Sequence, residues 1–177
     1  MKTSFPTLTT DRLLLRQIVP EDQPLVFKGL SHPEVIKYYE VSYPTLEATK
    51  EQMDWYKGLE ESGTGLFWAI CSPDNSSFYG VGGIYDLSQV HKKAEIGFWL
   101  LPEHWGRGYM QEAFGAMEDY CFNTLKLHRL EGYVEAGNDK CVSAITKVGY
   151  ELEGTMKDSE MKNGQFISVH IFAKVHG

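Results

Sequence analysis

Three strand-like segments follow one another in the middle of the chain, with no room for a helix between them. Residues 66–72 (LFWAICS), 78–87 (FYGVGGIYDL) and 93–101 (KAEIGFWLL) are apolar, and the turn residues PDNSS separate the first two. Connections this short join neighbouring strands as an antiparallel meander, because a parallel crossover needs a longer connection. The pattern therefore excludes a doubly wound fold, in which helices alternate with the central strands.

Helix and strand patterns alternate on both sides of this meander. The elements predicted before it are a strand at 12–19, one or two short helices within 21–39, and a longer helix at 45–62 that ends at Gly63. Those predicted after it are an amphipathic helix at 109–125, a strand at 128–136, a short helix at 138–148, and strands at 150–156 and 165–175 joined by an Asn163-Gly164 turn. This order predicts a mixed α/β sheet in a single domain spanning residues 1–177, with no repeat or linker.

Composition and charge narrow the class of partner. The formal net charge of −7 disfavours binding to nucleic acid through a basic face. It suits a cationic partner, or simply keeps the protein soluble. No apolar run reaches the length of a membrane span, and the N-terminus lacks the pattern of a signal peptide. We therefore expect a cytoplasmic protein, either a monomer or a homodimer, that binds neither nucleic acid nor membrane.

The cysteines and histidines do not predict a metal site. Cys71, Cys121 and Cys141 are odd in number and widely spaced, which favours reduced thiols over disulfides. No CxxC, HxxxH or HExxH spacing occurs in the sequence. We expect neither a structural nor a catalytic metal.

A glycine loop, EHWGRGYM at residues 103–110, lies between a predicted strand and a predicted helix. The first N–H groups of a helix have no partner within the helix, and the helix dipole is positive there. Gly106 and Gly108 would let the backbone fold closely around phosphate oxygens, and Arg107 would add a charged donor. These residues alone are equally compatible with a plain tight turn.

Two common phosphate loops do not fit this segment. A P-loop requires Lys followed by Ser or Thr after its glycines, and here Tyr109 and Met110 follow. A dinucleotide fingerprint requires a third glycine, and Gln111 stands in its place. The ligand of the loop must therefore be sought in a wider pattern.

The wider pattern resembles the GNAT superfamily of acetyl-coenzyme A dependent N-acetyltransferases. The resemblance rests on AEIGFWLLPEHWGRGYMQEA (94–113) followed by HRLEGYVEAGNDKCVSAITKVGY (128–150). The opening LTTDRLLLRQIVPEDQPLVF and the ending GYELEGTMKDSEMKNGQFISVHIFAKV resemble the branch of ribosomal-protein N-terminal (alanine/serine) acetyltransferases. The resemblance covers nearly the whole chain. It implies the GNAT fold, a mixed and mostly antiparallel central sheet with two splayed parallel strands and flanking helices, and acetyl-coenzyme A as cosubstrate.

The resemblance also implies where the cofactor binds. In this family a loop of pattern Gln/Arg-x-x-Gly-x-Gly/Ala wraps the pyrophosphate with backbone amides, and here it falls on Trp105 to Met110. Trp105 replaces the polar residue, and Met110 replaces the small one, which would narrow the path of the pantetheine arm. Strand amides near residues 98–101 would bind that arm. The implied cofactor-binding residues are Phe98, Trp99, Leu100, Leu101, Trp105, Gly106, Arg107, Gly108, Tyr109, Met110 and Asn138.

Glu95 and Cys141 are the candidate catalytic residues. Glu95 is the one charge within AEIGFWLL, and a glutamate at the matching place is the general base in some GNAT enzymes; its alternative role is a solvated strand-start residue. Many family members carry a tyrosine as proton donor seven residues after the asparagine, where Ile145 stands here. Cys141 takes the place of a serine found in the ribosomal-protein branch, although a small buried hydrophobe is the commoner role of a cysteine. Tyr150 is a more remote substitute.

The early helices and the last hairpin are expected to form the acceptor pocket. Tyr38, Tyr39, Glu40 and Tyr43, with Trp55 and Tyr56, would make an aromatic and acidic rim for a cationic amine, or equally an aromatic core. The resemblance favours direct acetyl transfer to a protein or peptide N-terminus. The alternatives are acetylation of a small amine, such as a polyamine or an aminoglycoside-like compound, and a non-catalytic acyl-coenzyme A binding module.

Overall fold

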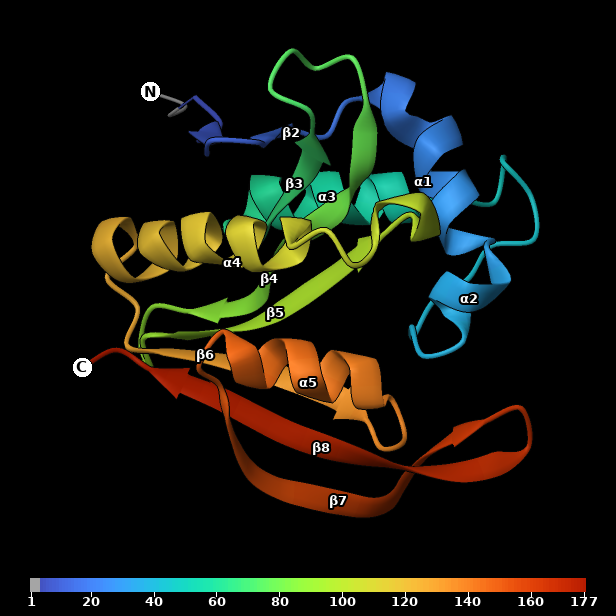
Figure 1. Ribbon diagram of the computed structural model, residues 1–177, viewed down its shortest axis with the longest axis vertical. Helices are drawn as coiled ribbons and strands as arrows, with labels where there is room; N and C mark the ends of the chain where they lie inside the picture. Colours follow the sequence, from blue (N-terminus) through green and yellow to red (C-terminus); the bar gives the residue numbers. More distant parts are fainter. Residues whose placement is uncertain (1–3) are drawn as a thin grey trace.

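The computed structural model describes residues 4–177 and contains an open sheet in the strand order β1-β2-β3-β4-β5-β6-β8-β7 (Figure 1). The strands are β1 (Leu8–Thr9), β2 (Leu14–Gln17), β3 (Leu66–Cys71), β4 (Phe78–Ser88), β5 (Lys93–Leu100), β6 (Arg129–Glu135), β7 (Glu151–Lys162) and β8 (Gln165–Val175). All neighbouring pairs are antiparallel except β5 and β6, which are parallel. The expected mixed and mostly antiparallel sheet is confirmed.

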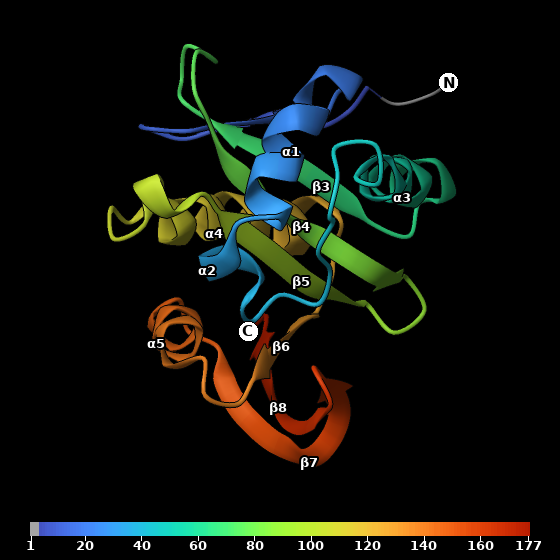
Figure 2. The ribbon, with the colours of Figure 1, turned by 90° about the vertical axis from the view of Figure 1, so that its right-hand side faces the viewer.

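Helices cover both faces of the sheet. They are α1 (Gln23–Leu30), α2 (Pro33–Ile36), α3 (Lys50–Ser62), α4 (Tyr109–Asp119) and α5 (Asp139–Lys147). Figure 2 shows α4 and α5 on one side of the sheet and α3 on the other. The buried side chains form two clusters accordingly. Phe114, Met117 and Ile145 belong to the cluster under α4 and α5, whereas Val26, Leu30 and Tyr56 belong to the cluster under α1 and α3.

The parallel pair separates soon after it begins. β5 and β6 are in register only at Lys93–Arg129, Ala94–Leu130 and Glu95–Glu131. Beyond this point β5 continues along β4 as far as Leu100, and β6 continues along β8 as far as Glu135. The two strands therefore diverge, which opens the sheet at its centre and leaves two facing edges without a strand partner among residues 4–177 (Figure 1).

Several boundaries differ from the sequence predictions. α3 begins at Lys50 rather than at Thr45, because the residues between form turns in which the Thr45 hydroxyl accepts a hydrogen bond from the Ala48 amide at 3.1 Å. The helix predicted at 109–125 changes at Tyr120 to a π-helical turn that extends to Thr124. β7 extends to Lys162 instead of ending near residue 156. The two-residue strand β1 was not predicted, since it is too short to show a pattern.

Candidate active site

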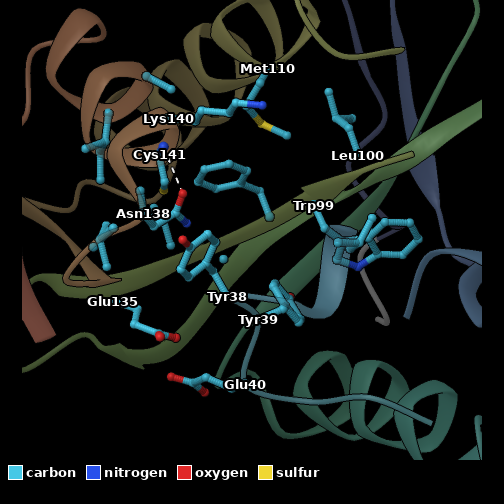
Figure 3. Close-up of a pocket in the computed structure, with 18 of the residues that line it drawn as sticks. Tyr38, Tyr39, Glu40, Trp99, Leu100, Met110, Glu135, Asn138, Lys140 and Cys141 are labelled. Carbon is cyan, nitrogen blue, oxygen red and sulfur yellow. Dashed lines mark hydrogen bonds between the residues drawn. The ribbon is translucent and has the colours of Figure 1, made fainter. Parts of the chain in front are cut away.

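A cavity of about 1480 Å³ occupies the opening between the splayed strands. Its walls come from the segment after α2, from β5, from the glycine loop with the start of α4, from β6 and from α5. Figure 3 shows Met110, Lys140 and Cys141 at one end of this cavity, and Glu40 and Glu135 at the other. The volume is large enough for an extended ligand with a polar end and an apolar arm.

The free edge of β5 supplies backbone donors to the cavity. Along a strand, alternate residues direct their N–H and C=O groups to opposite sides. The Leu101 amide donates to the Tyr79 carbonyl of β4 at 2.8 Å, whereas the Leu100 carbonyl accepts from the Trp105 indole at 2.9 Å on the opposite side. The N–H groups of Phe98 and Leu100 therefore face the opening, and Phe98, Trp99 and Leu100 all line the cavity.

Both glycines of the loop adopt a left-handed backbone conformation. Gly106 has φ +71° and Gly108, the N-cap of α4, has φ +77°, a region that L side chains rarely adopt. A Cβ atom at Gly106 would meet no heavy atom of the protein within 4 Å, so its backbone is open to a ligand. Gly106, Gly108, Tyr109 and Met110 line the cavity, where the first N–H groups of α4 lack helical partners.

An N-terminal arginine, which the sequence analysis did not single out, anchors this loop. The Arg12 guanidinium donates to the Arg107 carbonyl at 2.9 Å and to the Glu112 carboxylate at 2.7 Å, and its centre lies 4.8 Å from the Tyr109 ring centroid. The Thr10 hydroxyl also donates to Glu112 at 2.5 Å. These contacts fix the first turn of α4 against the N-terminal segment. Only the spatial pairing of residues about a hundred positions apart reveals them.

Asn138 and Cys141 lie together at the start of α5. The Asn138 side-chain oxygen accepts a hydrogen bond from the Cys141 amide at 3.3 Å, as an N-cap does (Figure 3). Both residues line the cavity. Burial raises the pKa of the Cys141 thiol to about 11, so the thiol holds its proton at neutral pH. The arrangement places a weak proton donor on the cavity wall.

Glu95 lies beside the cavity rather than in its wall. It pairs with Tyr85 of β4, whose side chain does line the cavity. Burial raises the pKa of the Glu95 carboxyl above its ordinary value; the Tyr85 hydroxyl opposes this shift, and the negative charges of Asp86, Glu131 and Glu40 add to it. Burial also raises the pKa of Tyr85, so its hydroxyl stays protonated. Glu95 can therefore exchange a proton with the cavity only through Tyr85 or through water.

Aromatic and acidic side chains surround the opposite end of the cavity. Five of the six residues expected there line it, namely Tyr38, Tyr39, Glu40, Tyr43 and Trp55. Tyr56 instead belongs to the core, with 5% exposure. Burial is the main cause of a raised pKa at the Glu40 carboxyl, and the negative charge of Glu160 raises that pKa further.

Besides Glu95 and Tyr56, three further residues that the sequence predicted lie outside the cavity wall. Leu101 is 2% exposed, and its amide is already bonded to Tyr79. Arg107 is exposed beside the loop and directs its carbonyl to Arg12. Tyr150 is 1% exposed, and burial, followed by the negative charge of Glu118, raises the pKa of its hydroxyl. The structure therefore does not place Tyr150 as a substitute proton donor.

Within residues 4–177, no helix is long and apolar enough to cross a membrane. The same residues contain no group of three or more His, Cys, Asp or Glu side chains that could hold a metal ion. Cys71, Cys121 and Cys141 are all free thiols.

Comparisons with known proteins point to one family. The acetyltransferase (GNAT) domain family model matches residues 12–151. The uncharacterized N-acetyltransferase YoaA of Bacillus subtilis is 31% identical over 172 residues, which cover 97% of each chain. The spermidine N(1)-acetyltransferase of Escherichia coli K12 is 28% identical, over 86% of this chain and 80% of its own. A solved structure of RimL, a ribosomal L7/L12 alpha-N-protein acetyltransferase in complex with coenzyme A, matches in fold with a TM-score of 0.84 at 20% identity, over 96% of this chain and 98% of its own.

Proposed function

The chain belongs to the GNAT family of acetyltransferases, and we propose that the amine it acetylates is the N-terminus of a protein or peptide. Enzymes of this family take the acetyl group from acetyl-coenzyme A. The relatives include both a protein N-terminal and a spermidine acetyltransferase, so the choice between acceptors must rest on this chain's own cavity.

The unpaired edge of β6 is the observation that carries the proposal. The Ala136 amide donates to the Ser168 carbonyl of β8 at 2.8 Å, so alternation directs the backbone of Tyr133 the other way, toward β5. Tyr133 and Glu135 line the cavity. An extended peptide can add to such an edge through main-chain hydrogen bonds, whereas a polyamine has no backbone to do so. The coenzyme A arm would use the other edge, along Phe98 and Leu100.

The glycine loop fits the pyrophosphate end of coenzyme A. Gly106 and Gly108 bring backbone N–H groups to the cavity, and the exposed Arg107 can add a charged donor to a phosphate oxygen. Asn138 and Met110 line the path from this loop toward the β5 edge, where the arm would lie. The donor set is therefore the one that a phosphorylated ligand with an extended amide-containing arm requires.

The reaction is a direct attack. The neutral amine nitrogen forms a bond to the thioester carbonyl carbon, and the carbonyl oxygen, now negative, is stabilised by the amides of Phe98 and Leu100. The carbon–sulfur bond then breaks, and the thiolate of coenzyme A accepts a proton from Cys141. Glu95 receives the proton that the amine loses, through Tyr85 or water. Proton exchange with solvent then returns Cys141 to the thiol and Glu95 to the carboxylate, and the products are the acetylated amine and free coenzyme A.

The acceptor class is tested with a panel of amines. Short peptides with free and with blocked N-termini are assayed beside spermidine at low and high salt, by release of the coenzyme A thiol. We expect turnover of free N-termini that persists in salt, because screening over a Debye length of about 8 Å weakens charge contacts more than main-chain contacts. Turnover of spermidine without any turnover of a free N-terminus would refute the peptide assignment. No thiol release with any amine would favour a binding module.

Replacement of Cys141 tests the proton donor. Cys141→Ala is expected to lower kcat by about tenfold, less than the usual 10²–10⁴-fold of acid–base catalysis, because a thiol is a weak donor and the thiolate can take its proton from water instead. Cys141→Ser should retain most of kcat, since a hydroxyl also donates. The KM for acetyl-coenzyme A is measured alongside. Equal kcat values for the alanine variant and the unaltered protein would leave Cys141 as a packing residue.

A further inference from the structure

Lys162, at the tip of the β7–β8 hairpin, joins three segments beside the acceptor end of the cavity. Its ammonium group donates to the Lys37 carbonyl at the end of α2, at 2.6 Å, and to the Glu135 carboxylate at the end of β6, at 2.9 Å. The side chains of Lys162 and Glu135 are only 25% and 15% exposed, so solvent screens this pair incompletely. Both Lys37 and Glu135 line the cavity, whereas Lys162 stands behind them.

The same ammonium group also acts on neighbouring carboxylates. Glu40 lines the cavity, and its pKa is raised by burial and by Glu160 and lowered by Lys162. The Lys162 nitrogen also makes a cation–π contact with the Tyr38 ring, 5.9 Å from the ring centroid. Lys162 thus acts on two of the carboxylates that line this end of the cavity, Glu135 and Glu40.

We propose that Lys162 is a specificity-determining residue that restricts the acceptor to a single ammonium group, because its own ammonium already pairs with Glu135, the carboxylate that would hold a second charge of a polyamine. This inference rests on the proposed peptide function. In a polyamine the attacking amine is neutral while the other nitrogens stay charged at neutral pH. A second ammonium would approach Glu135 against the like charge of Lys162, and rejection by like charge is a common source of specificity. A peptide without basic side chains meets no such repulsion.

The test compares acceptors in the same protein preparation. The ratio of kcat/KM for spermidine to kcat/KM for a neutral peptide with a free N-terminus is measured at low salt for wild type and for Lys162→Gln. We expect this ratio to rise by about tenfold, the order of one charge-assisted hydrogen bond gained by the second ammonium. Loss of folded protein cancels in the ratio, and Lys162→Met provides a second neutral variant that keeps the apolar stem.

Three variants separate the local contact from general charge effects. Lys162→Arg keeps the positive charge and should keep the wild-type ratio. Lys157→Gln removes an equal charge from the same strand, at an exposed position outside the cavity wall, and should also leave the ratio unchanged. Glu135→Gln combined with Lys162→Gln removes the carboxylate that would receive the second ammonium, and should return the ratio toward that of wild type.

The outcomes distinguish this inference from the function on which it rests. Wild-type turnover of peptides with an unchanged ratio in Lys162→Gln would overturn the role of Lys162 alone. An equal rise in Lys157→Gln would overturn it as well, since the effect would then be one of net charge. Wild-type turnover of spermidine and of no peptide would refute the proposed function, and the inference with it.

Discussion

Replacing Glu95 by Gln is expected to lower kcat by about 10²-fold, at the lower end of the range for a general base, because the amine must then lose its proton to bulk water. Gln has nearly the same shape and keeps the register with Tyr85 and Glu131. The coenzyme A dissociation constant should change little, since Glu95 lies outside the cavity wall. The measurement is kcat and kcat/KM with a free-N-terminus peptide, beside calorimetric binding of coenzyme A.

The role of Glu95 as a base also predicts the direction in which the rate changes with pH. A base works in its deprotonated form, so the rate should rise as pH increases through the pKa of Glu95. Burial, with the charges of Asp86, Glu131 and Glu40, raises that pKa above the ordinary carboxyl value, which moves the acid limb of the profile toward neutral pH. The part of the acid limb that belongs to Glu95 should disappear in Glu95→Gln, which leaves the limb set by the acceptor amine, whose reference pKa is about 8. Tyr85→Phe should lower kcat if the proton passes through the Tyr85 hydroxyl, and should leave it unchanged if water carries the proton directly.

A wild-type rate and a wild-type acid limb in Glu95→Gln would contradict this role. Glu95 would then be an ordinary strand residue. Glu131→Gln is not a suitable control, because Glu131 accepts hydrogen bonds from Lys93 and Arg129, and its loss leaves Arg129 with Glu153 alone and removes the carboxylate that pairs with Lys93. Glu151→Gln is better suited, because Glu151 is exposed on β7 and lies outside the cavity wall.

An alanine at Gly106 should weaken coenzyme A binding by about ten- to a hundredfold, which corresponds to one charge-assisted hydrogen bond of about 1.5–3 kcal/mol. The φ of +71° disfavours any Cβ atom, so the loop would shift and misdirect its amides. The Cβ atom would also enter the space into which the backbone opens. Binding of coenzyme A is measured by calorimetry.

Gly63 provides a matched control for this variant. It also has φ +71° and no heavy atom within 4 Å of the Cβ position, but it caps α3 and lies outside the cavity wall. Gly63→Ala and Gly106→Ala should therefore lose similar stability in thermal melting, about 1–2 kcal/mol of left-handed strain each. Only Gly106→Ala should lose affinity. Equal affinities in the two folded variants would show that the loop does not bind the pyrophosphate.

The sequence was most informative where local chemistry decides the structure. The glycines at 106 and 108 marked a loop between a strand and a helix, and both adopt a left-handed conformation that few other residues reach. Gly63 was recognisable as a helix stop for an equally local reason, and the helix predicted from residue 138 does begin there, with Asn138 as its N-cap. These features positioned the loop and the start of α5, and hence two walls of the cavity.

Features that depend on contacts between distant segments could not be derived from local patterns. The parallel pairing of β5 with β6 ends at Glu95, and no residue pattern marks that end; only family resemblance implied the splay. The register between β4 and β5 places Glu95 opposite Tyr85, outside the cavity wall. The contact of Lys162 with Lys37 spans 125 positions of sequence, and that of Arg12 with Glu112 spans 100. In each case tertiary packing, rather than residue type, determines the role.

The most direct test locates the acetyl group on a peptide that carries both a free N-terminus and a lysine. The protein is incubated with this peptide and acetyl-coenzyme A near pH 7, and tandem mass spectrometry identifies the acetylated nitrogen. The α-amine has a reference pKa of about 8 and lysine about 10.4, so a direct attack by neutral amine favours the N-terminus. We predict acetylation at the N-terminus of the peptide and one coenzyme A released per acetyl group transferred. We also predict that no acetyl group becomes attached to the enzyme itself. Acetylation confined to the lysine, or no acetylation of the peptide while spermidine is turned over, would contradict the account.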